Sequence, residues 1–225
     1  MQSITSYEPT KRSVANASRK GRHVIDRIGG EVVVIAATAL EAAAARKALP
    51  RVRVLEAGIG LAKLPRGAFD GADVVISCGL AGGLSAILPS GSVLIPHEVR
   101  RPDGTTFPCD PGAVEALTIA AQRLGHAPDA EPLLTSTTIV RGPQRAQWAQ
   151  LGYGGVDMES GLICVRKMAV VRVVLDTPQR ELHADWLSPG RALRNPRNWA
   201  EALWLAQWAP RYARRAAEIV AKACS

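Results

Sequence analysis

The stretch EVVVIAATALEAAAARKALP, residues 31–50, decides the fold class. Its first half is a continuous apolar run rich in β-branched residues, which is typical of a strand buried on both faces. Its second half is rich in alanine, a strong helix former, and lies between Thr38, a suitable N-cap, and Pro50, which would stop a helix. We therefore expect a buried strand and then a helix over 38–49, as in an α/β domain.

The same alternation continues along the chain. Further short apolar runs are VRVLEAG, ADVVISCG, SVLIP, PLLTSTTIV, GLICVRKM and AVVRVVLD, and the long C-terminal stretch NWAEALWLAQWAPRYARRAAEIVAK has helical character. This pattern predicts an α/β fold, a single domain with a central mixed, largely parallel β-sheet flanked by helices. No repeat or linker divides the chain, so we expect one domain over residues 29–225 after a poorly ordered polar leader, residues 1–28.

Composition narrows the class of protein. Hydrophobic residues make up 47 % of the 225 residues, which is enough for a sizeable core. The chain has neither a run long enough to span a bilayer nor a signal-peptide segment, so we expect a cytoplasmic protein. The four cysteines lack CxxC spacing, and neither a disulfide, a metal nor a cofactor is expected. The net charge of +8 suits nucleic acid, an anionic substrate or an anionic membrane, and equally a solvated basic face.

Glycine-rich turns follow two of the predicted strands, EAGIG at 56–60 and SCGLAGGLSAILPSG at 77–91. In open α/β sheets, ligands bind beyond the carboxyl ends of strands, where glycine lets the backbone approach them. The second stretch is a candidate wall of such a site, although Gly82–Gly83 fits an ordinary tight turn better. The candidate wall consists of Gly79, Leu80, Ala81 and Gly82.

The motif GVDMES, residues 155–160, sets two carboxylates around one methionine. Glu159 or Asp157 could accept two hydrogen bonds from the vicinal diol of a ribose, and Met158 offers an apolar surface for the sugar. The acids would also suit the first turn of a helix over GLICVRK, and the pattern alone favours that explanation.

Two further carboxyl groups are candidates. Asp176 ends the run AVVRVVLD, where partial desolvation can raise its pKa into the range of a general acid, although a turn initiator before proline is the commoner case. Glu41 lies just beyond the first strand and is either exposed on the helix or an isolated carboxylate that faces the site.

These elements, in this order, resemble the purine nucleoside phosphorylase and uridine phosphorylase superfamily, whose nucleosidase branch cleaves methylthioadenosine and adenosylhomocysteine. VVVIAATALEA is similar to the first strand and acidic turn of the family, EAGIG and SCGLAGGL to its glycine turns, GVDMES to its most diagnostic motif, and VVRVVLD to the strand that ends in the base-binding aspartate. The resemblance covers nearly all of residues 31–180 and implies the nucleoside phosphorylase fold.

The resemblance also implies a role for each matched residue. Glu159 would accept hydrogen bonds from the ribose hydroxyls, Met158 would pack against the sugar, and Asp157 would frame the turn. Asp176 would protonate or hydrogen-bond N7 of the purine, so that the base leaves neutral while positive charge develops on the ribose. Contacts to the base would come from Ile139 and Val140.

The resemblance leaves two nucleophiles possible, phosphate and water. Phosphorolytic members hold phosphate with an arginine and a serine near the glycine turn that SCGLAGGL resembles, and this chain has Ser77 and Leu80 at those positions. Glu41 falls where nucleosidases carry the glutamate that activates water, so the resemblance leans towards hydrolysis. Phosphate as a co-substrate would need an arginine from elsewhere, namely Arg46, Arg66, Arg141 or Arg145. The segment between Glu159 and Asp176 is shorter than in the family, which predicts a truncated helix.

The C-terminal third looks most like the hopanoid-associated phosphorylases, which are thought to remove adenine from adenosylhopane. It combines an apolar group, Trp199, Leu203, Trp204 and Trp208, with Arg194, Arg197, Arg211, Arg214 and Arg215. This pattern suits peripheral docking on an anionic membrane to reach a nucleoside-lipid, and equally a core-packed helix with a basic outer side.

The sequence leaves two rival functions possible. One is a soluble methylthioadenosine or adenosylhomocysteine nucleosidase of purine and methionine salvage. The other is a non-catalytic nucleoside- or nucleic-acid-binding protein, and the scattered basic residues argue against nucleic acid as a partner. The family resemblance also implies a homo-oligomer.

Overall fold

The computed structural model describes residues 27–187 and 189–225, so residues 1–26 of the predicted leader lie outside it. The strands are β1 Val32–Ala36, β2 Arg53–Glu56, β3 Val74–Gly83, β4 Val93–Leu94, β5 Glu98–Arg100, β6 Thr106–Pro108, β7 Leu133–Thr135, β8 Gly155–Asp157 and β9 Met168–Val174. The α-helices are α1 Ala39–Ala48, α2 Pro111–Arg123, α3 Pro143–Gln150, α4 Pro189–Ala192 and α5 Trp199–Cys224. Short 3-10 turns are η1 Ile59–Leu61, η2 Ser160–Leu162, η3 Ala184–Leu187 and η4 Pro196–Asn198.

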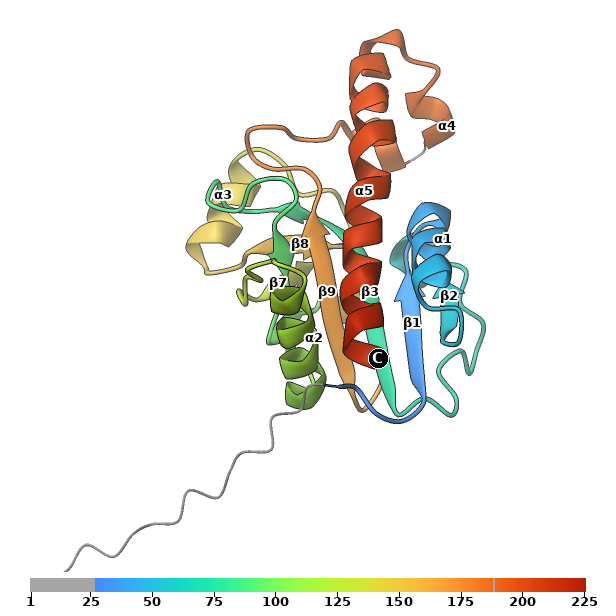
Figure 1. The fold of residues 1–225 in the computed structure, drawn as a ribbon. Helices are drawn as coiled ribbons and strands as arrows, with labels where there is room; N and C mark the ends of the chain where they lie inside the picture. Colours follow the sequence, from blue (N-terminus) through green and yellow to red (C-terminus); the bar gives the residue numbers. More distant parts are fainter. Residues whose placement is uncertain (1–26, 188) are drawn as a thin grey trace, which may run out of the picture.

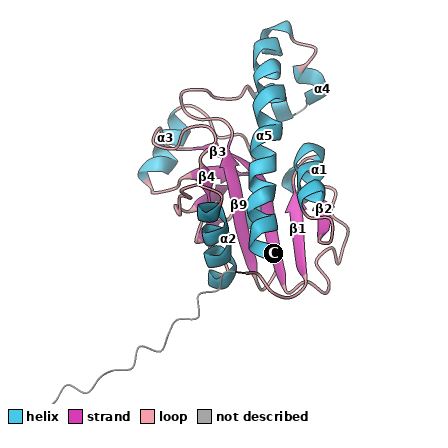
Figure 2. Ribbon diagram, in the orientation of Figure 1, coloured by secondary structure: helices cyan, strands magenta, loops and turns pink. Residues whose placement is uncertain are grey.

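The strands form one mixed sheet, as the sequence predicts (Figures 1 and 2). Its order is β2-β1-β3-β8-β7-β5-β6, and β9 pairs with β3 and β4 outside this path. The pairs β1·β2, β1·β3, β3·β9, β5·β7 and β7·β8 are parallel. The pairs β3·β8, β4·β9 and β5·β6 are antiparallel. The parallel pairs bring the carboxyl ends of β1, β3 and β9 to one edge.

Strand β3 joins the two parts of the sheet. Most of it runs between β1 and β9, and its last two residues pair with Val156 and Gly155 of β8. The predicted tight turn at Gly82–Gly83 is therefore wrong, because both residues continue the strand. A Cβ atom on Gly83 would lie 2.9 Å from Cγ1 of Val174, so glycine is needed here for the close approach of β9.

Helices α1, α2 and α5 cover one face of the sheet, and Figure 1 shows α5 between the other two. Alternate residues of each central strand face the two sides: Val34 and Ile76 pack with the helices, whereas Val33 and Val75 pack with residues of the second half of the sheet. This double burial explains why these strands are continuous apolar runs. Ile28 is also buried and donates its N–H to the carbonyl of Ala223, at 2.8 Å.

The segment after GVDMES is not the helix that its acidic start suggested. After β8 the chain makes only the single turn η2, and Ile163 already has extended dihedral angles, φ −77° and ψ 120°. The side chain of Ile163 is buried in the core, and the N–H of Gly161 donates to Oγ1 of Thr135 at 2.7 Å. A helix over GLICVRK is thus wrong, and the helix between Glu159 and Asp176 is reduced to one turn.

Helix α5 has two unlike halves on either side of Pro210. Its C-terminal half packs in the core through Tyr212, Ala216 and Ile219. Its N-terminal half projects with α4 beyond the edge of the sheet (Figure 1) and exposes Trp199. Core packing is therefore confirmed for the C-terminal half, and docking of the N-terminal half on a membrane stays a prediction. Among the described residues, no helix is long and apolar enough to cross a membrane.

We expect the C-terminal half of α5 to carry much of the stability of the domain. Ile219 is completely buried, so Ile219→Ala should lower the free energy of unfolding by about 2–4 kcal/mol through lost burial and a cavity. Leu203, which is 75 % exposed on the same helix, is the matched control. Leu203→Ala should change the free energy of unfolding by less than about 0.5 kcal/mol. Urea denaturation measures both, and equal losses would contradict this division of the helix.

Candidate active site

A cavity of about 510 Å³ lies beyond the carboxyl ends of β1, β3, β8 and β9. Each strand end contributes part of its wall, and the chain after β9 and the projecting half of α5 close it on the remaining side. The charged residues that line it are Glu41, Arg145, Asp157, Glu159 and Asp176. All five are buried, so their charges act with little screening by solvent.

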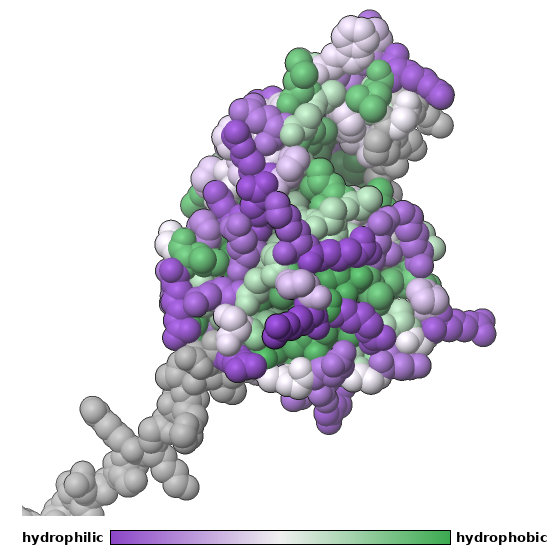
Figure 3. All heavy atoms as spheres, turned by 45° about the vertical axis from the view of Figure 1, so that its right-hand side comes forward, coloured by the Kyte–Doolittle hydropathy of each residue, from purple (hydrophilic) through white to green (hydrophobic). Residues whose placement is uncertain are grey.

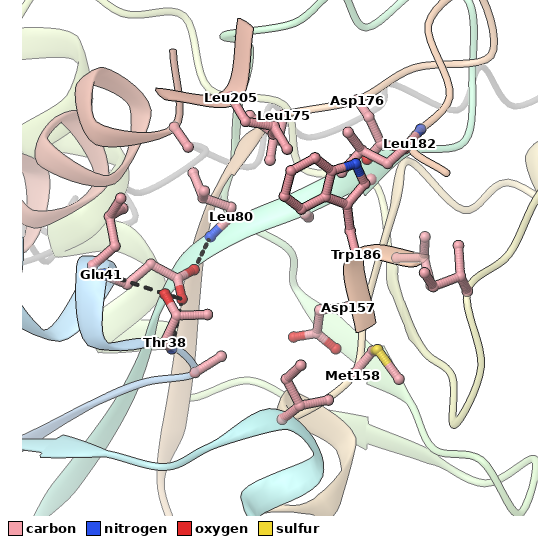
Figure 4. A pocket seen from close by; sticks show the side chains of 18 of the residues that line it. Thr38, Glu41, Leu80, Asp157, Met158, Leu175, Asp176, Leu182, Trp186 and Leu205 are labelled. Carbon is pink, nitrogen blue, oxygen red and sulfur yellow. Dashed lines mark hydrogen bonds between the residues drawn. The ribbon is translucent and has the colours of Figure 1, made fainter. Parts of the chain in front are cut away.

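Glu41 faces the cavity and also starts helix α1 (Figure 4). Its Oε2 accepts from the N–H of Thr38 at 2.8 Å and from the hydroxyl of Thr38 at 2.6 Å, and the N–H of Glu41 donates to Oγ1 of Thr38 at 3.3 Å, which completes the capping box. Its Oε1 accepts from the N–H of Leu80 at 2.7 Å. A Cβ atom on Gly79 would overlap this carboxylate, so the glycine lets Glu41 reach strand β3. Glu41 is thus fixed by its own helix start and by the backbone of strand β3.

Asp157, at the end of β8, and Arg172 of β9 form a buried ion pair. The guanidinium of Arg172 donates to Oδ2 of Asp157 from Nε at 3.1 Å and from Nη2 at 2.7 Å, and Nη2 also lies 2.7 Å from Oγ of Ser77. Oδ1 of Asp157 accepts from the hydroxyl of Thr135 at 2.7 Å. The hydroxyl of Ser160 donates to Oδ2 of Asp157. This network holds β3, β7, β8 and β9 together at the site.

Glu159 is the least compensated of these carboxyl groups. Its Oε1 accepts from the N–H of Gly60 and its Oε2 from the N–H of Met158, both at 3.3 Å. Burial, and next the carboxylate of Asp157, raise the pKa of Glu159 to about 7, against the lowering effect of Arg172. For Arg172, burial alone would lower the pKa, but the surrounding carboxylates raise it overall. Each carboxyl oxygen of Glu159 can therefore take part in a further hydrogen bond with a ligand in the cavity.

Asp176 sits at the end of β9 in a second buried ion pair. Its Oδ2 contacts Nη2 of Arg145, a residue of α3, and also accepts from the N–H of Leu182 at 3.4 Å. Arg145 donates further to the carbonyls of Val140, at 3.0 Å, and Gly83, at 2.7 Å. Burial raises the pKa of Asp176 above its ordinary value, and Arg145 opposes this effect only in part.

The structure brings most of the predicted site residues to the same cavity. Its lining includes Glu41, Leu80, Ala81, Gly82, Ile139, Val140, Met158, Glu159 and Asp176. Gly79 lies behind Glu41 and does not line the cavity. In the described part of the chain, no group of three or more His, Cys, Asp or Glu side chains is placed to hold a metal ion.

The four arginines weighed as phosphate ligands lie elsewhere or are engaged. Arg46 is exposed on α1, and Arg66 lines a separate hollow beside Phe69 and Cys164. Nε of Arg141 lies 3.7 Å from Oε2 of Glu181, and Arg145 is paired with Asp176. Ser77, at one of the two positions compared with the phosphorolytic members, is buried and bonded to Arg172.

Sequence reasoning missed two parts of the site. The first is the role of two buried arginines: Arg145 was considered only as a phosphate ligand and not as the partner of Asp176, and Arg172 was not considered. The position of Arg172 inside the apolar run AVVRVVLD was a signal, because a buried charge requires a partner. The second part is an apolar outer wall that comes from the chain after β9 and from α5: Leu182, Trp186, Leu193, Ala202, Leu205, Ala206 and Ala209.

We expect stability to depend on pH through Glu159. Folding raises its pKa from 4.5 to about 7. The associated stabilisation is fully present below about pH 4.5 and lost as the pH rises through about 7, because only the folded state holds this proton there. The loss should reach up to about 3 kcal/mol. Urea titrations at several pH values should show Glu159→Gln flattening this dependence and the exposed control Glu115→Gln leaving it unchanged. Parallel curves for all three proteins would refute this assignment.

Comparison with known proteins identifies the family and the fold. A family model described as the phosphorylase superfamily matches residues 2–181. The fold is similar to the methylthioadenosine/adenosylhomocysteine nucleosidase of Neisseria meningitidis in complex with methylthio-immucillin-A, with 20 % identity, TM-score 0.66, and 85 % of this chain and 97 % of that chain covered.

Two further solved structures show the same likeness. The nucleosidase of Campylobacter jejuni has 13 % identity and a TM-score of 0.68, over 87 % of this chain and 99 % of that one. A futalosine hydrolase mutant of Helicobacter pylori has 10 % identity and a TM-score of 0.67, over 87 % and 98 %. No curated protein sequence matches significantly. The chain therefore has the fold of these nucleosidases and is an enzyme that belongs to the phosphorylase superfamily.

Proposed function

We propose that this protein cleaves the N-glycosidic bond of an adenosine-type nucleoside and releases adenine. The observation that carries the proposal is the placement of buried carboxyl groups on different sides of one cavity, Glu41 on one and Asp176 on the other (Figure 4). Glu159 and Met158 line the cavity as well, so a ribose held by them would have a carboxyl group near its reacting carbon and another near the base.

The proposed chemistry follows the charge that develops as the bond breaks. The electron pair of the bond between C1′ and N9 leaves with the purine, and N7 takes a proton from Asp176, whose raised pKa suits a proton donor. Both protein contacts of Asp176 described above use Oδ2, so Oδ1 would meet the base. Positive charge on the ribose is stabilised by Glu159 and Glu41.

Water is the proposed nucleophile, and Glu41 its base. Three hydrogen bonds hold the Glu41 carboxylate at the cavity wall, and the remaining lone pair of Oε1 can accept a proton from water as the oxygen attacks C1′. Arg145 is the one cation among the described cavity-lining residues, and Asp176 already pairs with it. Four carboxyl groups line the cavity, so a phosphate dianion would meet their negative charge without a free cation, which favours hydrolysis over phosphorolysis.

The apolar outer wall of the cavity favours a substrate with an apolar substituent on C5′ of the ribose. The residues that η3 and α5 add to the cavity are apolar except for the indole N–H of Trp186. Burial of a hydrocarbon there would contribute about 25 cal/mol per Å². We therefore propose a nucleoside-lipid such as adenosylhopane as substrate, in hopanoid biosynthesis. Methylthioadenosine, with its small apolar substituent, is the alternative, as part of purine and methionine salvage.

Adenine release tests this function directly. Purified protein is incubated with adenosine, methylthioadenosine or adenosylhopane, each with and without phosphate. We expect phosphate-independent release, fastest from adenosylhopane, and a loss of about 10²-fold or more in kcat for Asp176→Asn, which removes the proton donor.

Each other outcome identifies a different function. Release that requires phosphate would refute water as the nucleophile, and turnover of methylthioadenosine alone would establish the salvage enzyme. The absence of release from all three substrates, with binding retained, would leave a non-catalytic nucleoside-binding protein.

The projecting half of α5 supports a peripheral contact with an anionic membrane. It exposes Trp199 and Leu203 next to the exposed residues Leu193, Arg194 and Arg197. Figure 3 shows hydrophobic and hydrophilic residues side by side on this projection. Leu193 also lines the cavity, so the apolar wall continues to the surface that would meet the bilayer. Apolar side chains with flanking arginines suit an anionic interface.

Vesicle binding tests this contact. The protein should co-sediment with vesicles that contain phosphatidylglycerol, bind pure phosphatidylcholine vesicles less, and lose binding as salt is raised. The double variant Trp199→Ser with Leu203→Ser should reduce binding at least about tenfold. Leu151→Ser, which alters a leucine 68 % exposed beyond α3, is the control. If the double variant binds vesicles normally but changes the oligomeric state in size-exclusion chromatography, the surface belongs instead to a homo-oligomer contact.

A further inference from the structure

Glu181 joins the segment after β9 to the start of helix α3. Its Oε1 accepts from the N–H of Gly142, the residue before α3, at 2.7 Å. The same oxygen lies 3.4 Å from Nε of Arg145, and Oε2 lies 3.7 Å from Nε of Arg141. Glu181 does not line the cavity, so its carboxyl group acts on the site through Arg145.

Arg145 therefore lies between two carboxyl groups. Its side chain is 2 % exposed, that of Asp176 8 % and that of Glu181 20 %, so solvent screens these three charges only weakly. The side chain of Arg141 is 41 % exposed, and solvent screens its charge more strongly. One buried cation thus faces two carboxyl groups, and a proton on one of them makes this group of three side chains neutral.

Asp176 is the carboxyl group of the three that faces the cavity and could take up that proton. An arginine beside a carboxyl group lowers its pKa, but burial raises the pKa of Asp176 by more than Arg145 lowers it. Three further carboxyl groups line the cavity and also disfavour a negative charge on Asp176, although the buried Arg172 offsets part of their own charge: Glu41, Asp157 and Glu159. Among the described residues, Glu181 is the carboxylate that shares Arg145 with Asp176.

We propose that Glu181 is a positioning residue that keeps Asp176 in its protonated, proton-donating form. Its negative charge offsets part of the attraction between Arg145 and an ionised Asp176. Its contacts with Gly142 and Arg145 also hold the guanidinium at Oδ2 of Asp176, so that Oδ1 is left for the base. The inference rests on the proposed adenine-releasing function and adds a residue outside the cavity that sets the proton state of the donor.

The test removes the charge of Glu181 and keeps its hydrogen bond. Glu181→Gln retains an oxygen that can accept from the N–H of Gly142. Glu201→Gln is the matched control, because Oε1 of Glu201 anchors the same segment from α5 by accepting from the N–H of His183 at 3.0 Å. The values of kcat and KM for adenine release from adenosine and from adenosylhopane are measured against pH. Carbon NMR follows the titration of the Asp176 carboxyl group, which is assigned with Asp176→Asn.

We expect kcat to fall as the pH rises through the pKa of Asp176, because only the protonated form can donate to the base. In Glu181→Gln this fall should lie about 0.5–1 pH unit lower, so that kcat at a pH above it is about three- to tenfold below the wild-type value. The kcat at a pH well below the fall, and KM, should be unchanged. The NMR titration of Asp176 should move to lower pH in the same way, and Glu201→Gln should match the wild type.

A wild-type pH profile or a wild-type titration of Asp176 in Glu181→Gln would overturn the assignment. So would an equal shift in Glu201→Gln, or a loss of kcat that is the same at every pH, which is the result of a merely structural role. If the wild type releases adenine and Glu181→Gln gives one of these results, only this inference fails. If the wild type releases no adenine, the proposed function fails and the role of Glu181 fails with it.

Discussion

The buried pair of Arg172 and Asp157 is the interaction on which the site depends. An arginine in the middle of a strand that is buried along its whole length would be strongly destabilising without a partner of opposite charge. Asp157 supplies that charge from β8, and the hydroxyls of Ser77 and Ser160 fill the remaining positions around it. These partners come from β3, β8 and η2. The two parts of the sheet must therefore lie in one relative position for Arg172 to make its hydrogen bonds to Asp157, Ser77 and Ser160 together. That placement also sets the position of Met158 and Glu159.

The same pair explains how the site can hold several carboxyl groups close together. One buried cation offsets part of the repulsion among Asp157, Glu159 and Glu41, yet Glu159 keeps a raised pKa. On the other side of the cavity, Arg145 does the same for Asp176, whose pKa stays above the ordinary value as well. Each side of the cavity thus contains one fully engaged arginine and at least one carboxyl group that binds a proton more readily than in water. This is the electrostatic arrangement that the proposed proton transfer requires.

Local rules predicted the fold well because its strands and first helix are locally determined. The run Val32–Ala36, the cap at Thr38 and the end of α1 before Pro50 each follow from residues within a few positions, and the α/β class follows from their repetition. GVDMES failed as a local pattern, since the acids were expected to start a helix. Two partners of Asp157, namely Arg172 and Thr135, are 15 or more residues away in sequence, and a one-turn 3-10 segment takes the place of the helix. The family resemblance predicted Glu159, Met158 and Asp176 as site residues, and all three line one cavity, whereas Trp186 and the wall of α5 have no local signal that marks them.

Glu41 has two tasks in this molecule, since it closes the capping box of α1 and faces the cavity. The first turn of α1 and the geometry around the proposed water site are therefore one cooperative unit, held by the same three hydrogen bonds. Fraying of that turn would withdraw the carboxylate from the cavity while the sheet and α5 stay folded. Activity would then be lost at temperatures at which most of the domain is still intact. The enzyme would accordingly be inactivated by a local opening of its first helix, and ligands that hold Glu41 in place would protect it.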